Sequence, residues 1–451
     1  MAPGNRLAMV AVMLAVALAT LDTAIANTAL PAIATGLHST PSESVWVVNA
    51  YQLAMVATIL PCAALGDAIG HRRVYIGGLM VFTAASLACA TAPTLPLLAT
   101  ARLLQGLGAS AITSVSIALV SALYPPGKLG RGVGVNALVV GVAVAVGPTT
   151  ASVILSSASW PWLFMINVPL GLIALVFALS ALPQTAKGVH PFDPVAALLN
   201  VVTFASLIFA LGEGGQRAPA IRMLGALAVA VLFCAWQIRR EAGRFAPMLP
   251  VDLLKRPVFA LSAVTAVCAF AAQGLAFVSL PFYFENVLHC SQIETGFLIT
   301  PWPVVVALVA PFAGRMSDRY PPGLLGAIGM VCLCAGFVSL VLLPAQPSVY
   351  AIAARMAICG VGFGFFQSPN IKALMASAPQ PRSGGASGVV ATARLIGQAA
   401  GAALVALCLG AHRGHGPTFA LAGGAMFAGI AAIASGLRLR ANSKQTGSFG
   451  G

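Results

Sequence analysis

The sequence contains little charge, and acidic residues are especially scarce. Only 8% of its 451 residues are charged and only 10 are Asp or Glu, whereas 59% are hydrophobic and the mean hydropathy is +0.94. A water-soluble domain cannot cover so much apolar surface with so few charged side chains. The composition therefore excludes a soluble globular protein and predicts a protein embedded in a membrane.

Motifs for metal binding, redox chemistry and nucleotide hydrolysis are also missing. The nine cysteines form no C-x-x-C pair and lie mostly within apolar runs, which favours a packing role. His412 and His415 lack a third ligand in their loop, so they make a poor metal site. No G-x-x-x-x-G-K-[ST] motif is present. We therefore expect no cofactor, no enzymatic activity and an ion gradient as the energy source.

Long apolar runs dominate the chain. Fourteen of them reach the ~20 residues that a helix needs to cross a hydrocarbon layer of ~30 Å. Strands of a membrane β-barrel would instead alternate in polarity over ~10 residues. We predict an all-helical membrane protein with helices at 7–31, 45–65, 74–92, 95–123, 132–155, 162–182, 194–211, 224–238, 258–284, 293–313, 324–343, 349–371, 385–409 and 417–437.

Two short charged turns indicate an internal repeat. Asp67 in the first turn and Asp318 in the second are 251 residues apart, and Arg102 and Arg355 are 253 apart. At ~30 residues per helix and loop this offset corresponds to about eight helices, so two helices are inserted between halves of six. The predicted parts are a six-helix bundle at 1–183, an insert of two helices and a basic loop at 184–250, a second six-helix bundle at 251–437 and a tail at 438–451.

The net charge of +14 follows the predicted loops. If the chain starts in the cytoplasm, the outer loops contain only Arg217, Arg222 and Arg413, and the positive-inside rule explains the asymmetry without a nucleic-acid partner. Both termini are then cytoplasmic. The basic residues of the inner loops include Arg72, Arg73, Lys128, Arg131, Arg239, Arg240, Lys255, Arg256, Arg315 and Arg319.

Asp22 is the one acid in the middle of an apolar run. A charged carboxyl at that depth is costly, so a functional role is the default interpretation, with a structural polar contact as the alternative. At 1.5 Å per residue, Asp22 lies ~13 Å and Arg102 ~10 Å below the same predicted surface. If the two side chains are in contact, Arg102 favours the ionised form of Asp22, whereas desolvation favours its neutral form. The balance between these two effects would make Asp22 a proton switch. A bound cation that competes with the proton would couple export to proton entry.

Other polar residues interrupt the apolar runs. Each is explained singly by hydrogen bonds between helices, whereas together they would line a central cavity for a lipophilic cation. Gly147 and Pro148 predict a bend in the helix at 132–155, because proline removes a backbone hydrogen bond. The candidate substrate-binding residues are Asn49, Tyr51, Gln52, Gln105, Asn136, Gln273, Trp302 and Gln367.

Several of these stretches resemble the major facilitator superfamily, specifically its fourteen-helix drug:proton antiporter branch. The resemblance spans the whole chain. Two positions depart from the loop signature, where Ala63 and Ala68 replace its first glycine and its arginine. The matching residues are Leu21 to Thr23, Asn27, Ala29 to Pro31, Trp46, Ala50, Tyr51, Leu53, Gly66, Asp67, Gly70, Arg72, Arg73, Arg102, Gln105, Gly106, Gly108, Phe164, Ile166, Asn167, Pro169 and Gly171.

The resemblance implies the major facilitator fold and a role for several residues. Asp22 and Arg102 would take part in proton coupling, and Gly147-Pro148 would form the antiporter motif, although Ala151-Ser152 replaces its following glycine pair. The two charged turns would form a latch between the bundles. Its residues are Asp67, Arg72, Arg73, Asp318 and Arg319.

We therefore expect a monomeric, proton-coupled exporter of small amphipathic or cationic compounds in a bacterial cytoplasmic membrane, working by alternating access around a midplane cavity. An exporter of one dedicated metabolite, such as an antibiotic or an amino acid, is the alternative. A membrane sensor that does not transport is a further alternative, against which the tail of about fourteen residues and the lack of a long loop domain argue.

Overall fold

The computed structural model describes residues 3–123, 129–185, 192–213, 220–242, 251–344, 346–377, 383–411 and 415–447. Within these ranges the secondary structure is helical, with no strand. In the part of the chain that the structure describes, fourteen helices are long and apolar enough to cross a membrane. The predicted class, an all-helical multi-pass membrane protein with fourteen spans, is confirmed.

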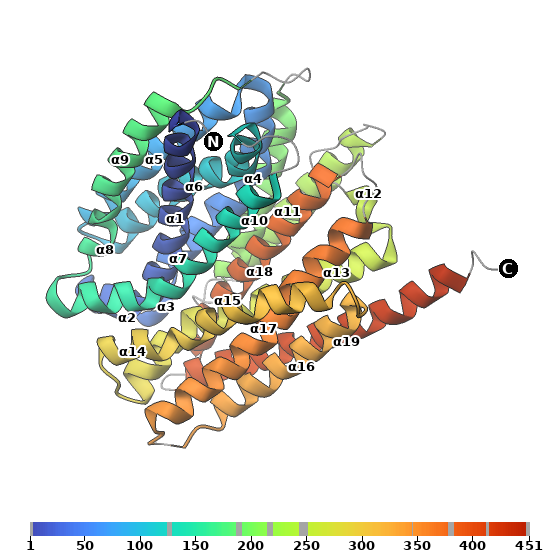
Figure 1. The fold of residues 1–451 in the computed structure, drawn as a ribbon. Helices are drawn as coiled ribbons and strands as arrows, with labels where there is room; N and C mark the ends of the chain where they lie inside the picture. Colours follow the sequence, from blue (N-terminus) through green and yellow to red (C-terminus); the bar gives the residue numbers. More distant parts are fainter. Residues whose placement is uncertain are drawn as a thin grey trace. The chain divides into compact units, whose positions relative to one another are not determined.

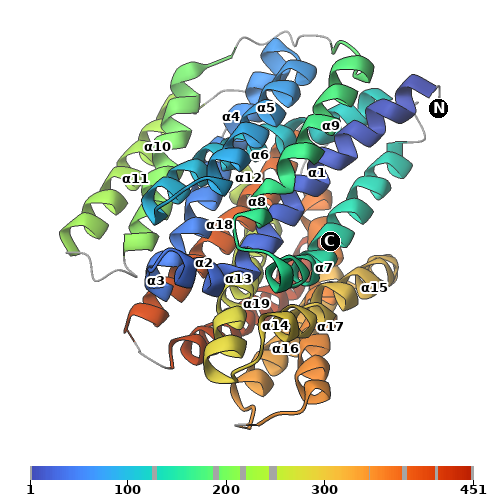
Figure 2. The same cartoon turned by 90° about the vertical axis from the view of Figure 1, so that its left-hand side faces the viewer.

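The chain forms two compact units, Met1–Gln237 and Ile238–Gly451. The first of the two inserted helices, α10 (Pro194–Glu213), belongs to unit 1, where it lies along α4 (Trp46–Ile69) (Figure 2). The Asn200 amide donates a hydrogen bond to the Ala57 carbonyl across this contact at 3.0 Å. The second inserted helix, α11 (Ala220–Glu241), exposes most of its apolar side chains, which suits a lipid-facing position.

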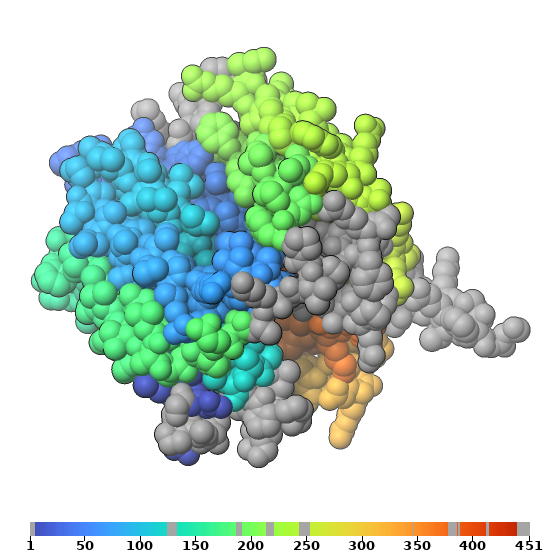
Figure 3. Space-filling view, turned by 90° about the horizontal axis from the view of Figure 1, so that it is seen from above, coloured from blue at the N-terminus to red at the C-terminus, as the bar shows by residue number. Residues whose placement is uncertain are grey.

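In unit 1 the helices, drawn in blue to green in Figure 1, have bounds close to those of the apolar runs. The first predicted helix ends three residues earlier than expected, at Thr28, because Pro31 cannot donate a helical hydrogen bond and the chain breaks at Ala29. In the view from above, the green atoms of α9 lie against the blue atoms of α5 (Figure 3). The remaining elements are α1 (Pro3–Thr28), α2 (Leu30–Gly36), α3 (Pro41–Ser44), α5 (His71–Ala90), α6 (Leu95–Leu123), α7 (Leu129–Ser157), α8 (Trp162–Met165) and α9 (Asn167–Ala181).

Unit 2 has an aromatic core between its helices, in which Trp302, Phe337 and Phe363 are almost fully buried. Helix α16 packs against α17 and α19, and α13 packs against α18 and α19 (Figure 1). The elements are α12 (Val251–Leu254), α13 (Pro257–Phe282), the π-helix η1 (Tyr283–Val287), α14 (Gln292–Ile299), α15 (Pro301–Met316), α16 (Pro322–Val341), α17 (Val349–Ser377), α18 (Ser383–Ala411) and α19 (Gly416–Gly447).

The predicted tail at 438–451 needs a correction. Helix α19 continues to Gly447, because no proline or glycine interrupts the chain directly after Leu437 and because Arg438 is buried against neighbouring helices. The last span is therefore followed by a helical extension.

The two units repeat the same packing contacts. Thr40 and Glu43 form a capping box in unit 1, and Ser291 and Glu294 form one 251 residues later. A Cβ atom added to Gly106 would lie 2.5 Å from the Tyr51 carbonyl oxygen, and one added to Gly360 would lie 2.6 Å from that of Trp302. The internal repeat predicted from the charged turns is thus present in the structure.

Candidate functional site

Asp22 and Arg102 form an ion pair inside unit 1. Asp22 lies on α1 and Arg102 on α6, and each is 1% exposed. The Nη1 atom of Arg102 donates to Oδ2 of Asp22. The contact expected from the matching depths of these two residues is therefore made, while its role in coupling stays a prediction.

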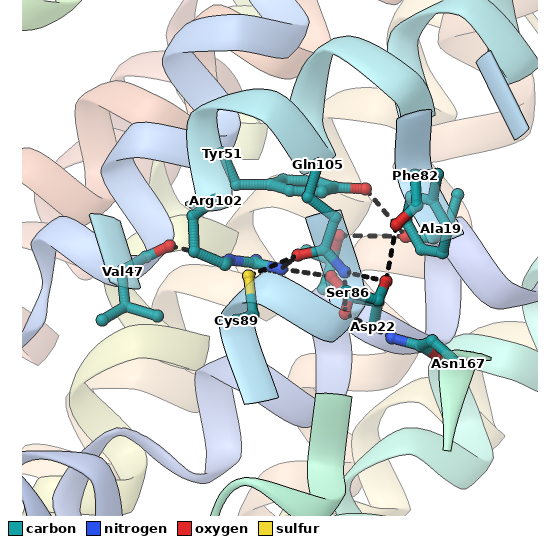
Figure 4. A network of polar contacts seen from close by, with 11 residues as sticks. Ala19, Asp22, Val47, Tyr51, Phe82, Ser86, Cys89, Arg102, Gln105 and Asn167 are labelled. Carbon is teal, nitrogen blue, oxygen red and sulfur yellow. Dashed lines mark hydrogen bonds and ion pairs between the residues drawn. The ribbon is translucent and has the colours of Figure 1, made fainter. Parts of the chain in front are cut away.

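Two amide side chains complete the surroundings of the Asp22 carboxylate (Figure 4). Gln105 Nε2 donates to Oδ1 of Asp22 at 2.9 Å, and Asn167 Nδ2 donates to the same oxygen at 2.8 Å. Gln105 is itself held by Ser86, whose Oγ accepts from Nε2 at 2.9 Å, and its Oε1 accepts from Arg102 Nη1 at 2.6 Å. The carboxylate thus receives hydrogen bonds from three side chains on α6 and α9.

Arg102 is fixed by further contacts besides the carboxylate. Its Nε donates to the Val47 carbonyl at 3.0 Å, and its guanidinium carbon lies 4.2 Å from the centre of the Tyr51 ring and 5.5 Å from that of Phe164. The Tyr51 hydroxyl donates to the Ala19 carbonyl at 3.1 Å, which orients the ring. Two aromatic faces therefore share the stabilisation of this cation.

The equivalent position in unit 2 is neutral. Gln273 stands 251 residues after Asp22, and its Oε1 accepts from Gln398 Nε2 at 3.1 Å. Arg355, the counterpart of Arg102, donates to the backbone carbonyls of Ser339 and Ala351, each at 2.9 Å. The packing of the repeat is therefore compatible with a neutral residue where unit 1 has Asp22.

The predicted substrate-binding residues lie in different surroundings. Gln105 and Tyr51 belong to the Asp22 network, and Trp302 is buried among Phe277 and Phe337 in the core of unit 2. The sequence does not distinguish the residues of the Asp22 network from buried polar residues that lack a hydrogen-bond partner. Buried polar atoms without a hydrogen-bond partner occur in Asn49 (both amide atoms), Gln52 (Oε1), Asn136 (Oδ1) and Trp302 (Nε1), while Gln367 is part-exposed.

In the charged turn of unit 1, the aspartate contacts a histidine of the same turn. Asp67 pairs with His71 at 3.1 Å, one helical turn later. Arg72 instead donates from Nη2 to the Leu179 carbonyl on α9 at 2.8 Å, because α5 starts at His71 and directs Arg72 toward that helix. Arg73 is exposed.

In the second turn, Asp318 pairs with Lys372 of α17, which also donates to the Ser317 carbonyl at 2.8 Å. Lys372 lies 54 residues from Asp318 in the sequence, so the sequence alone does not indicate this pair. A latch between the bundles stays a prediction.

The predicted hinge lies close to the Asp22 site. Pro148 is inside α7, and Gly147 packs so tightly against Ala24 of α1 that an added Cβ atom would overlap that side chain. Helices α1 and α7 are therefore in close contact at Ala24, which is two residues after Asp22 in the sequence. Among the described residues, no group of three or more His, Cys, Asp or Glu could hold a metal, and His412 lies outside those residues.

The family model of the Major Facilitator Superfamily matches residues 12–402. The chain belongs to this superfamily. Among its members, the uncharacterized transporter YebQ of Escherichia coli (strain K12) is 49% identical over 96% of this chain and 95% of YebQ. The riboflavin transporter RibZ of Clostridioides difficile (strain 630) is 29% identical over 88% of this chain and 86% of RibZ. The multidrug resistance protein Stp of Mycobacterium tuberculosis (strain CDC 1551 / Oshkosh) is 31% identical over 87% of this chain and 73% of Stp.

Membership of the Major Facilitator Superfamily makes this chain a membrane transporter and not an enzyme. The family resemblance seen in the sequence motifs is confirmed. The relatives differ in what they carry, so the substrate has to be argued from the site.

Proposed function

We propose that the protein is a proton-coupled antiporter that exports small amphipathic or cationic compounds across the bacterial cytoplasmic membrane by alternating access. The observation that carries this proposal is the buried ion pair of Asp22 and Arg102, which is supported by Gln105 and Asn167. The similarity to the multidrug resistance protein Stp favours the same substrate class.

The coupling follows from the cost of separating buried charges. Taking Arg102 away from an ionised Asp22 leaves a carboxylate without a counter-ion, which costs ~3–5 kcal/mol. Protonation of Asp22 removes that charge and lowers the cost of moving α1 relative to α6. Proton binding at Asp22 thus favours a conformational change that the ionised network opposes.

Asn49 and Gln52 are suitable substrate contacts. Both lie on α4 on either side of Tyr51, and both are buried with amide atoms that lack a partner. Unpaired buried amides are destabilising unless water or a ligand satisfies them. A substrate amine or hydroxyl would satisfy them.

The proposal is tested by efflux of a fluorescent lipophilic cation from cells, with and without a protonophore. We expect the protonophore to abolish efflux by the wild type and Asp22→Asn to abolish it without the protonophore. Glu43→Gln is the matched control, because it also removes one acid but only disturbs the exposed capping box at the start of α3. Full activity of an Asp22→Asn variant that is present in the membrane at the wild-type amount would refute the coupling site.

A transporter of one dedicated metabolite is the second candidate. The similarity to RibZ, whose name specifies a single compound, favours it. A panel of structurally unrelated toxic compounds distinguishes the two candidates. Protection against several chemical classes supports the multidrug proposal, whereas protection against one compound, or none, supports the dedicated transporter.

A further inference from the structure

Unit 2 contains a cavity of about 440 Å³ at the end that the basic loops predict to face the cytoplasm. The starts of α13 and α16, the end of α17, and α19 form its wall. Much of this wall is apolar and includes Val258, Ala373 and Leu439. Two arginines, Arg256 and Arg438, also line it. The cavity thus combines positive charge with an apolar surface.

Arg438 is a buried cation surrounded by neutral groups. It is 2% exposed, and its Nη1 donates to Ser262 Oγ at 2.8 Å and to Asn370 Oδ1 at 2.7 Å. Its Nη2 donates to the Pro322 carbonyl at 3.0 Å and to Ser435 Oγ at 3.1 Å, while its Nε has no hydrogen-bond partner. None of the described acidic residues forms an ion pair with it. A bound anion would supply the missing counter-charge.

Two helix N-termini add to this positive field. Helix α13 begins at Pro257 and α16 at Pro322, and the residues that precede them, Arg256 and Pro321, make no side-chain cap. Helix starts carry a partial positive charge, which favours anions. Arg256 is exposed at the rim, where its Nη1 donates to the Ser377 carbonyl at 3.0 Å.

The neighbouring acid does not cancel this field. Asp318 precedes the Pro321–Pro322 start of α16 by a few residues, but it pairs with Lys372 at the end of α17. The two cavity arginines therefore remain as excess charge among the described residues around the cavity.

We propose that this cavity binds a phosphate-bearing anion through Arg438, Arg256 and the starts of α13 and α16. An anionic phospholipid headgroup and free phosphate offer the same chemistry, because both present phosphate oxygens to arginine and to the positive ends of helices. The apolar wall favours the lipid, whose glycerol and acyl portions can cover it. The bound anion joins the cytoplasmic ends of four helices and stabilises unit 2.

Thermal unfolding of the full-length protein in detergent tests this proposal. We compare dioleoylphosphatidylglycerol, dioleoylphosphatidylcholine and inorganic phosphate at equal ionic strength. Phosphatidylglycerol should raise the unfolding temperature and phosphatidylcholine should not, since a ligand stabilises in proportion to its occupancy of the folded state. Arg256→Gln should raise the lipid concentration needed for the same stabilisation about tenfold, because one charge-assisted contact is lost.

Matched variants separate binding from folding. Arg239→Gln is the control, because Arg239 is exposed on α11 and does not line the cavity. Arg438→Gln tests the buried cation, and Ala376→Trp fills the cavity from its exposed rim if the Arg438 variant fails to fold. Stabilisation by phosphate that is lost in the same variants would identify free phosphate as the ligand of the proposed site. Equal effects of both lipids with none from phosphate, or a response unchanged by Arg256→Gln and Ala376→Trp, would overturn the proposal.

Discussion

At the scale of single residues, the central feature is a carboxylate inside a membrane helix. It forms an ion pair with an arginine and accepts hydrogen bonds from two amides. The rise of 1.5 Å per residue fixes depth, so the sequence already indicated that Asp22 and Arg102 could meet. Rotation of each helix about its axis depends on packing, so Asn167 and Ser86 could not be assigned to the network. Gln105, a predicted substrate contact, also belongs to this network, and its contact with substrate stays a prediction.

The buried pair predicts a specific pattern of stability. Arg102→Gln leaves Asp22 without its cation and should lower the free energy of unfolding by ~3–5 kcal/mol. Adding Asp22→Asn to this variant removes the uncompensated charge and should recover most of the loss. Thermal unfolding of the single and double variants in one detergent measures the effect. A double variant no more stable than Arg102→Gln would contradict the assignment of the loss to a buried charge.

At the scale of helices, apolar runs and prolines predicted most boundaries. The run at 95–123 coincides with α6 (Leu95–Leu123), whereas the last helix continues past its predicted end at 437 because Arg438 makes hydrogen bonds within unit 2. An arginine after an apolar run is usually exposed at the interface, so sequence alone favoured a tail. Lys372 was missed as a partner of Asp318 for a related reason, since pairing across two helices needs their relative placement.

Adjacent glycines on α5 test the helix packing. An added Cβ atom on Gly78 would lie 2.6 Å from the Cβ of Ala111, whereas one on Gly77 has nothing within 4 Å. Gly78→Ala should therefore cost ~1–3 kcal/mol by overpacking. Gly77→Ala should be neutral or stabilising by up to ~1 kcal/mol, because alanine is the better helix former. Unfolding temperatures of the two purified variants measure this, and equal values would contradict the close contact between α5 and α6.

At the scale of the whole molecule, the repeat and its asymmetry matter most. Sequence offsets predicted two halves, and the matching capping boxes and glycine contacts show them in the structure. The polar network is not repeated, since Gln273 occupies the position that corresponds to Asp22. If the fold required an acid at this position, both halves would have one. We therefore infer that Asp22 serves a function that unit 2 does not share.

The distribution of basic residues predicts that both termini lie in the cytoplasm. Green fluorescent protein fused after residue 451 should be fluorescent, and alkaline phosphatase fused there should be inactive. Phosphatase fused after Ala92, between α5 and α6, should be active because this loop is predicted to lie outside. Active phosphatase at the C-terminus would reverse the orientation.

The most direct test of the account is proton movement driven by substrate in proteoliposomes that contain the purified protein and an internal pH-sensitive dye. An imposed gradient of a transported lipophilic cation should drive protons in the opposite direction through the wild type. Asp22→Asn should show no such proton movement, while Glu43→Gln should match the wild type. Equal substrate-driven proton fluxes through the wild type and Asp22→Asn would contradict the claim that Asp22 couples transport to protons.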